Sequence, residues 1–349
     1  MIHSFIENHW EKRSLLSFLF LPIAIIFSLI SKIRRLLFRL KIFKSYISKS
    51  KIISVGNLAV GGSGKTPFTI FLAKFLQSKG KKVAVSHRGY KGKFEKQIKL
   101  ISDENSIFDF AKDAGDEPFM MAKNLSGIPV VVGKNRKQAI EILEKKCAPD
   151  FIILDDSFQN FSVKHNIDFL LFNAENPFGN QFVIPSGMLR EEINSIKFAD
   201  ILILNNSNKN FEIPQKIIKF QKPIFQTEYK IQNFVNFHTN DKNEAKYFLK
   251  KNLFLISGIG NPKSFENSIK NQKIHFSHHF IFPDHHKFDY EKEIKPIIQK
   301  AIAEGIDAII TTEKDFVKLK DLSSSAIEFY FAKLNVKIKN MDEFEKIKF

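Results

Sequence analysis

The chain has 349 residues, 44% of them hydrophobic, which is enough apolar material for two domains and excludes a disordered chain. Its 54 basic and 37 acidic side chains give a net charge of +17, which favours anionic partners, although a compositional bias toward Lys, Ile, Asn and Phe explains part of that charge equally well. The single cysteine, Cys147, excludes a disulfide framework and a cysteine-based zinc site, and it indicates a reducing, cytoplasmic compartment.

The first segment of the chain joins an uncharged apolar run to a basic one. Residues 14–31 carry no charge, and a helix over them would reach about 27 Å, slightly less than a hydrocarbon core of about 30 Å. We expect Pro22 to interrupt this helix near its middle. The residues that follow alternate apolar with basic side chains, the basic ones being Lys32, Arg34, Arg35, Arg39, Lys41 and Lys44.

Such a basic and apolar pattern is typical of helices that lie on an anionic membrane surface. We therefore expect residues 1–46 to form a membrane-associated helical segment that lies at the interface. A membrane-spanning helix, a buried core helix and a cleaved signal peptide are the alternatives, and no small-residue cleavage site supports the last of them.

A glycine-rich loop follows the first predicted strand. Residues 51–55 form a short apolar run typical of a buried parallel strand, and the loop covers residues 56–64. Apolar residues then recur at helical spacing from Thr66 until Gly80 ends the helix, and residues 82–86 form a second strand. Strand, loop, helix and strand in this order are the setting of a P-loop.

A P-loop binds the phosphates of ATP or GTP. The backbone N–H groups that would surround the β-phosphate at the helix N-terminus belong to Gly61, Gly62, Ser63, Gly64 and Lys65. The Lys65 ammonium would bridge the β- and γ-phosphates, and the Thr66 hydroxyl would bind Mg²⁺. Ala59 stands where the pattern has its first glycine, and Gly61 and Gly62 supply the backbone freedom instead.

Acidic residues follow predicted elements at two places. Asp155 and Asp156 end the apolar run 151–154, at the carboxyl edge of a parallel strand where P-loop proteins hold Mg²⁺. Asp116 and Glu117 begin a helical stretch. Carboxylates there stabilise the helix dipole, or Asp116 accepts a proton from a substrate hydroxyl.

Other polar residues are weaker candidates. Each of Arg88, Arg136 and Arg190 follows an apolar run and is a candidate phosphate contact or a surface charge. Adjacent His285 and His286 point in different directions, and no further Cys or His lies at ligand spacing, so we do not expect a zinc site. One of the two histidines could orient a carboxylate base, or both could belong to a surface loop.

The second half of the chain again alternates strands with helices. Residues 226–251 are more polar than their surroundings and indicate a linker, with apolar strands over residues 253–257 and 308–312 behind it. The loop 258–262 lacks the rest of a dinucleotide fingerprint, so we do not expect NAD.

The fold class is therefore α/β. We expect a P-loop NTPase-like, mostly parallel sheet with helices on both faces in residues 47–225. A second, smaller α/β domain would occupy residues 252–349, and the cleft between the two domains would close on ATP.

Motifs spread over residues 56–315 resemble those of tetraacyldisaccharide 4′-kinases, the lipid A 4′-kinases of Gram-negative bacteria. They are GNLAVGGSGKTP, SHRGY, AGDEP, VGKNR, LDDSFQN, PSGMLREE, KFADILILN, SGIGNP, FPDHHKF and TTEKD, in the order of that family. The family usually reads DDGFQH where this chain has Ser157 for the glycine and Asn160 for the histidine, so the details of that loop differ.

The resemblance implies transfer of the ATP γ-phosphate, with Mg²⁺, to the 4′-hydroxyl of a tetraacylated disaccharide 1-phosphate, giving lipid IVA. This acceptor is an anionic glycolipid, and the reaction would take place at the cytoplasmic face of the bacterial inner membrane. Asp116 would be the base, assisted by His285 or His286, of which His285 is favoured. The residues implied to bind MgATP are Lys65, Thr66, Asp155 and Asp156, with Glu117, Arg136, Arg190 and Glu191 lining the site.

The alternative is a membrane-associated P-loop GTPase with a regulatory or metallochaperone role. The chain has no guanine-binding N-K-x-D string, which counts against that reading. Nucleic-acid binding has no recognition motif behind it, and we expect no obligate protein partner.

Overall fold

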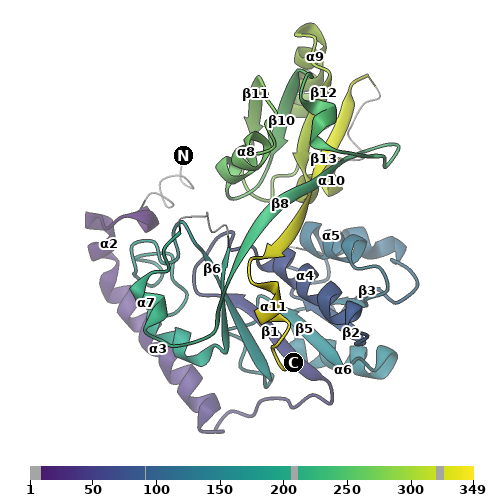
Figure 1. The fold of residues 1–349 in the computed structure, drawn as a ribbon. Helices are drawn as coiled ribbons and strands as arrows, with labels where there is room; N and C mark the ends of the chain where they lie inside the picture. The colour runs from purple at the N-terminus through teal and green to yellow at the C-terminus, as the bar shows by residue number, and fades with distance from the viewer. Residues whose placement is uncertain (1–8, 91, 206–210, 320–325) are drawn as a thin grey trace.

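The computed structural model describes residues 9–90, 92–205, 211–319 and 326–349, which form two lobes that share one β-sheet (Figure 1). The strand order across this sheet is β11-β10-β12-β13-β8-β7-β6-β1-β5-β2-β4-β3, and β9 pairs with β8. Neighbouring strands are parallel except at β13–β8, β3–β4 and β8–β9. The predicted α/β class with a mostly parallel sheet is confirmed.

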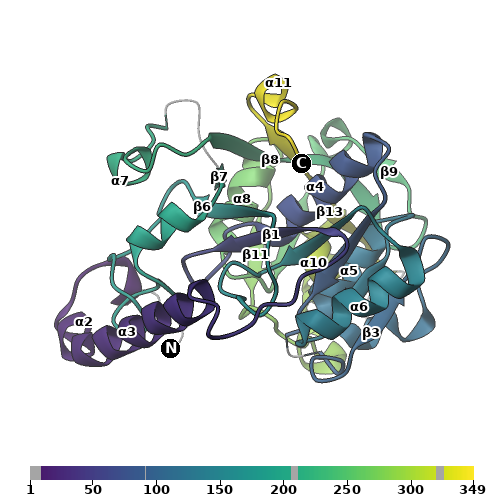
Figure 2. The ribbon, with the colours of Figure 1, turned by 90° about the horizontal axis from the view of Figure 1, so that it is seen from below.

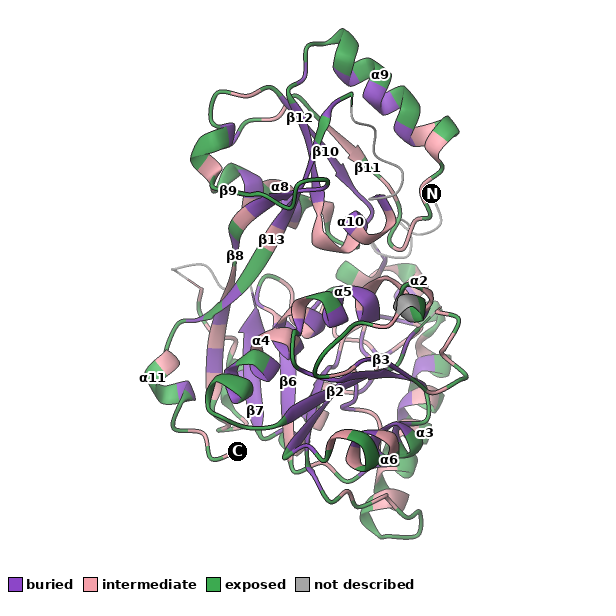
Figure 3. Cartoon of the chain, turned by 90° about the vertical axis from the view of Figure 1, so that its right-hand side faces the viewer, coloured by how far each residue is buried: buried purple, intermediate pink, exposed green. Residues whose placement is uncertain are grey.

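The lower lobe of Figure 1 contains the predicted P-loop. Its strands are β1 (Lys51–Asn57), β2 (Val83–His87), β3 (Lys99–Ser102), β4 (Val130–Val132), β5 (Phe151–Asp155), β6 (Ile167–Asn173) and β7 (Ile201–Asn205). Its helices after the N-terminal segment are α4 (Lys65–Ser78), α5 (Asp116–Asn124), α6 (Arg136–Cys147) and α7 (Gln215–Ile218), with 3₁₀ turns at Asp109–Ala114 and Ile193–Phe198. The central strands are buried on both faces, as a parallel sheet requires (Figure 3).

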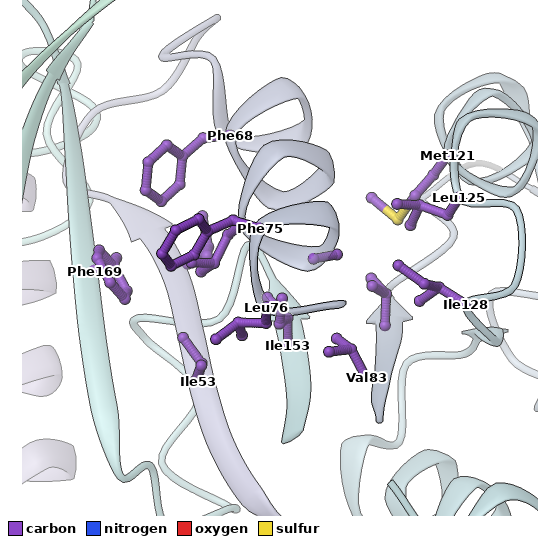
Figure 4. Packing of buried hydrophobic residues seen from close by; sticks show 14 of the residues in the cluster. Ile53, Phe68, Phe75, Leu76, Val83, Met121, Leu125, Ile128, Ile153 and Phe169 are labelled. Carbon is purple, nitrogen blue, oxygen red and sulfur yellow. The ribbon is translucent and has the colours of Figure 1, made fainter. Parts of the chain in front are cut away.

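Successive side chains of the central strands point to opposite faces of the sheet and pack into two apolar cores. Ile53 of β1 and Ile153 of β5 pack under α4 and α5, with Phe68 and Phe75 of α4 (Figure 4). Ile52, one residue earlier, points to the opposite face and packs against α6. The predicted helices on both faces of the sheet are therefore present.

The upper lobe is a smaller parallel sheet between helices. It contains β10 (Leu253–Ser257), β11 (His278–Ile281) and β12 (Ala308–Thr312), with β9 (Lys242–Asn243) beside β8. Its helices are α8 (Pro262–Lys270), α9 (Lys295–Ala303) and α10 (Glu313–Leu319), with a 3₁₀ turn at Ala245–Phe248 and a π-helical turn at Tyr290–Ile294.

Two long strands connect the lobes. β8 (Ile224–Asn236) leaves the lower lobe beside β7, and β13 (Glu328–Ile338) returns beside it in the antiparallel direction. Residues 226–251, predicted as a linker, therefore begin with a strand of the shared sheet. The segment is polar, but its pairing with β13 stabilises the strand.

The end of the chain belongs to the lower lobe, which corrects the predicted domain boundary of 252–349. After β13, the short helix α11 (Met341–Phe344) places Phe344 among the side chains of the lower core. The Phe344 ring is fully buried, and its centroid lies 5.4 Å from that of Phe75 and 5.2 Å from that of Phe225. The upper lobe is thus an insertion between two parts of the lower one.

The N-terminal segment forms two helices, α2 (Leu15–Leu19) and α3 (Leu21–Arg39). The break lies at Phe20, and Pro22 occupies the first turn of α3, where its missing N–H group is not needed. α3 lies along the side of the lower lobe opposite α4 (Figure 2). Among the described residues, no helix has the length and apolar character needed to cross a bilayer.

Truncation of Phe344 tests whether α11 is part of the lower core. Phe344→Ala should lower the free energy of unfolding by about 3–5 kcal/mol, because it leaves a cavity among large rings. Ile302→Ala on α9, where the side chain is exposed, should change it by less than about 1 kcal/mol. Denaturant unfolding measures both variants, and equal values would contradict this packing.

Candidate active site

A cavity of about 1830 Å³ lies between the lobes. Lower-lobe side chains that line it include Lys65, Asp116 and Asp156, and upper-lobe ones include His285 and Lys314. Small-molecule sites usually measure about 300–1,000 Å³, so this cavity has room for a nucleotide and a second substrate. All of the predicted P-loop residues line it, namely Gly61, Gly62, Ser63, Gly64, Lys65 and Thr66.

Side chains from neighbouring strands hold the P-loop in place. Tyr229 of β8 donates its hydroxyl to the Gly64 carbonyl at 2.9 Å, and Asn205 of β7 donates to the Ser63 carbonyl. Asn57 of β1 donates to the Ser63 hydroxyl at 2.8 Å. Gly64 has φ +74°, and a Cβ there would lie 1.9 Å from the Tyr229 oxygen, so only glycine fits.

The residues predicted to bind Mg²⁺ meet at the start of α4. Thr66 and Thr69 donate their hydroxyls to the two oxygens of Asp155 at 3.1 and 3.0 Å. Burial raises the pKa of Asp155. Burial also opposes the charge of Asp156, but Lys65 at 3.7 Å and Arg190 at 2.8 Å outweigh that effect and lower its pKa.

Oxygen donors of this kind fit Mg²⁺. In the described part of the chain, no group of three or more His, Cys, Asp or Glu side chains is arranged to hold a metal by itself. Kinases usually hold Mg²⁺ with one or two protein groups, water and the phosphates of the substrate. The Thr66 hydroxyl and the adjacent Asp155 carboxylate are such groups.

His87, at the end of β2, connects this site to the start of α5. The Gly89 N–H group donates to its Nδ1 at 2.9 Å, so the neutral ring carries its proton on Nε2. That Nε2 lies 3.5 Å from Asp155 and 3.5 Å from Glu117. Asp116, the neighbour of Glu117, is thereby held beside the residues expected to bind the nucleotide.

Asp116 lies where the two lobes meet. His285 Nδ1 and Lys318 Nζ are each 3.8 Å from its Oδ2. Burial would raise the pKa of Asp116, but the nearby His285 ring and the charges of Lys318 and Lys314 lower it. Asp116 is therefore an ionised carboxylate and able to accept a proton.

The two adjacent histidines have different surroundings, as the sequence predicted. His285 lines the cavity and faces Asp116. His286 turns back into its own lobe, where its Nε2 contacts Glu293 at 2.8 Å and its ring stacks on Phe282. The structure thus brings His285, and not His286, to the carboxylate.

The comparisons with known proteins agree with this geometry. The family model described as tetraacyldisaccharide-1-P 4′-kinase matches residues 16–347. The chain belongs to this family.

Relatives and a solved structure are similar along nearly the whole chain. The tetraacyldisaccharide 4′-kinase of Desulfotalea psychrophila is 33% identical over 330 residues, covering 93% of each chain. That of Actinobacillus pleuropneumoniae serotype 5b is 33% identical over 313 residues, covering 90% of this chain and 89% of the relative. A crystal structure of LpxK from Aquifex aeolicus in complex with ATP is 28% identical, with a TM-score of 0.78 over 95% of this chain and 98% of that one.

Two residues that the resemblance to the 4′-kinase family implied in the site do not line the cavity. Arg136 is buried at the start of α6, where it donates to the Ser86 hydroxyl at 3.0 Å and to the backbone carbonyl of Asp155. Burial lowers its pKa to about 10. Glu191 pairs with Arg35 of α3 at 2.7 Å. Arg136 thus supports the strand end that carries Asp155, and Glu191 attaches the N-terminal helix.

Several residues of this kinase's site carry no signal that was recognised in the sequence. Lys314 and Lys318 lie four positions apart on α10, so they share one face of that helix and both reach the Asp116 region. The TTEKD motif contained Lys314 but offered no sign of its partners. His87 could have been found from its place at the end of β2, since carboxyl ends of parallel strands meet at one edge.

The required glycine of this kinase P-loop can be tested without substrate. Gly64→Ala should lower the free energy of unfolding by about 1–3 kcal/mol from the left-handed backbone alone, and the contact with Tyr229 adds to that loss. Gly62→Ala is the matched control, because no heavy atom lies within 4 Å of its Cβ position. Denaturant unfolding of the nucleotide-free protein gives both values. A control variant as unstable as Gly64→Ala would refute the steric argument.

Proposed function

We propose that this protein transfers the γ-phosphoryl group of ATP to the 4′-hydroxyl of a tetraacylated disaccharide 1-phosphate, producing lipid IVA in lipid A biosynthesis. Membership of the 4′-kinase family supports this activity. The observation that carries the proposal is the His87 ring, whose Nε2 lies 3.5 Å from both Asp155 and Glu117. It joins the P-loop end of the cavity to the Asp116 end, so donor and acceptor groups share one site.

The P-loop end binds the nucleotide. The backbone around Lys65 surrounds the phosphates, and its ammonium offsets their charge. Thr66 with Asp155 or Asp156 would hold Mg²⁺, which would supply positive charge to offset that of the phosphates. Arg190 lines the same cavity and adds a further positive charge near the phosphates.

The other end activates the acceptor. Phosphoryl transfer depends on positioning and charge neutralisation more than on covalent chemistry, so one well-placed base is sufficient. The ionised Asp116 accepts the proton of the sugar hydroxyl, while His285 donates toward the same carboxylate and keeps it oriented.

We further infer that α2 and α3 rest on the cytoplasmic surface of the inner membrane. Ile26, Leu29, Ile30 and Ile33 are all exposed and form one apolar stripe at helical spacing, and contiguous apolar surface of this kind is typical of a membrane or protein contact. The opposite side of α3 binds the lower lobe, where Ser28 donates to Glu192 at 2.5 Å. Exposed apolar residues of the whole segment include Leu15, Phe18, Leu19, Ile23, Ile25, Leu36, Leu40, Ile42 and Phe43.

The cavity supports this orientation. Its lining extends to Trp10 and Glu11, immediately before α2. A glycolipid bound with its sugar near Asp116 can therefore leave its acyl chains on the side of the N-terminal helices. Basic residues of that segment suit anionic headgroups.

Removal of the base should separate chemistry from nucleotide binding. Asp116→Asn should lower kcat by about 10²–10⁴-fold and change ATP affinity by less than about threefold, since Asp116 contacts the acceptor and not the P-loop. The assay follows label from γ-labelled ATP into the disaccharide lipid. Asp113→Asn changes a half-exposed acid of the same segment that pairs with Lys93, and it should retain full activity. An unchanged kcat in Asp116→Asn would remove Asp116 from the role of base.

Charge on the apolar stripe should release the protein from membranes. The double variant Ile26→Glu with Leu29→Glu should bind phosphatidylcholine–phosphatidylglycerol vesicles at least about tenfold more weakly, because each buried apolar side chain contributes about 1.5–3 kcal/mol. Ile302→Glu on α9 changes an equally exposed residue and should leave binding unaltered. Vesicle flotation provides the measurement, and equal binding by all three proteins would contradict the membrane contact.

A further inference from the structure

The proposed chemistry leaves the role of one buried cation open. Lys314, the second residue of α10, is a residue of the upper lobe whose side chain is only 16% exposed. Its Nζ lies 3.0 Å from Glu117 Oε1 in the lower lobe, and 3.0 Å from Asp284 Oδ1 and 3.3 Å from His285 Nε2 in its own lobe. Lys314 therefore connects the lobes at the point where His285 faces Asp116.

Three atoms surround the Lys314 ammonium. This group has three N–H donors and no acceptor, and the atoms around it are two carboxylate oxygens and the Nε2 of His285. Burial favours its neutral form, but the charges of Glu117 and Asp284 outweigh burial and raise its pKa. Lys314 is therefore protonated and can only donate.

This fact decides which ring nitrogen of His285 carries the proton. If Nε2 held a hydrogen, two N–H donors would face each other at 3.3 Å. Asp284 Oδ2 also lies 3.9 Å from Nε2, but the Lys314 ammonium is closer, at 3.3 Å, and favours a lone pair on this nitrogen. The proton of the neutral ring is then on Nδ1. Nδ1 is the atom that lies 3.8 Å from Asp116 Oδ2.

We propose that Lys314 is a positioning residue that fixes His285 as its Nδ1–H tautomer, aimed at Asp116. This proposal rests on the kinase function proposed above. The histidine then donates to one oxygen of the Asp116 carboxylate and leaves the other oxygen for the sugar hydroxyl. Because Glu117 belongs to the lower lobe, its contact with Lys314 attaches this arrangement of the upper lobe to the residue beside Asp116.

The neighbouring lysine does not duplicate this role. Lys318 Nζ lies 3.8 Å from Asp116 and 2.7 Å from Asp315 Oδ1, so it pairs with a second carboxylate of its own helix. It stabilises the charge of Asp116 but makes no contact with His285 that would select a tautomer.

The experiment compares Lys314→Met with Lys314→Arg. Lys314→Met keeps the unbranched shape and most of the length of the side chain and removes its donors, so kcat should fall at least about tenfold while affinity for a non-hydrolysable ATP analogue stays within about twofold. Lys314→Arg keeps charge and donors and should recover part of kcat. Lys295→Met, which removes an exposed upper-lobe lysine paired with Glu291, is the matched control and should behave as the unmodified protein.

A spectroscopic measurement tests the tautomer directly. In ¹⁵N-histidine-labelled protein with the ATP analogue bound, the His285 resonances, assigned by their loss in His285→Asn, should show a protonated Nδ1 and an unprotonated Nε2. Lys314→Met should abolish this preference. A His285 that is protonated at Nε2 in the unmodified protein, or a Lys314→Met variant with undiminished kcat, would overturn the proposal.

Failure of the proposal for Lys314 can be distinguished from failure of the proposed kinase function. If the unmodified protein does not label the lipid, the proposed function fails, but the tautomer measurement still decides the role of Lys314. If the Lys314→Met variant does not fold, the spectrum of the unmodified protein decides it alone.

Discussion

The antiparallel ladder between β8 and β13 is the constraint on which the rest of the structure depends. Its two strands are the covalent connections between the lobes in the described chain, and they pair from Tyr330 and Asn236 to Ile338 and Thr227. The ladder extends the sheet of one lobe into that of the other. Consequently Asp116 and His285, which belong to different lobes and lie far apart in the sequence, come within 3.8 Å. A flexible linker would not hold two groups at such a distance without a large entropic cost.

In the cavity between the lobes, acidic side chains lie next to basic or imidazole side chains. Acidic groups of the lower lobe, Asp155, Asp156 and Glu117, each face a basic or imidazole group, and the upper lobe contributes Lys314 and Lys318. Burial alone would neutralise these carboxylates, and the adjacent cations keep most of them ionised. The site is therefore set up for a substrate that brings several negative charges of its own.

The sequence-based predictions of helices, strands and loops that succeeded depend on short sequence patterns. A P-loop, a strand ending in two aspartates and a helix beginning with Asp116 are defined by residues close together in the chain, and each formed where predicted. The errors involve partners distant in sequence. Glu191 was expected to line the site but binds Arg35, which is 156 positions earlier, and Arg136 turns inward to a neighbouring strand end. No local pattern distinguishes an arginine that meets a phosphate from one that supports a backbone carbonyl.

The same limit applies to the strand that replaced the predicted linker and to the lysines of α10. β8 is polar because part of it crosses between lobes and is only half-buried, so its composition resembles that of a loop. Lysine is so frequent in this chain that Lys314 had no distinguishing feature before its three partners were seen.

The return of the chain to the lower lobe has a consequence for how the protein is made. During synthesis the P-loop, α4 and the strands around them emerge early, yet the ring that fills the space beside Phe75 is Phe344, which follows the whole inserted lobe in the chain. The apolar core of the nascent lower lobe therefore stays incompletely packed until the whole inserted lobe has been translated. The two lobes mature together, and a ribosome that stalls within the insertion leaves both of them incomplete.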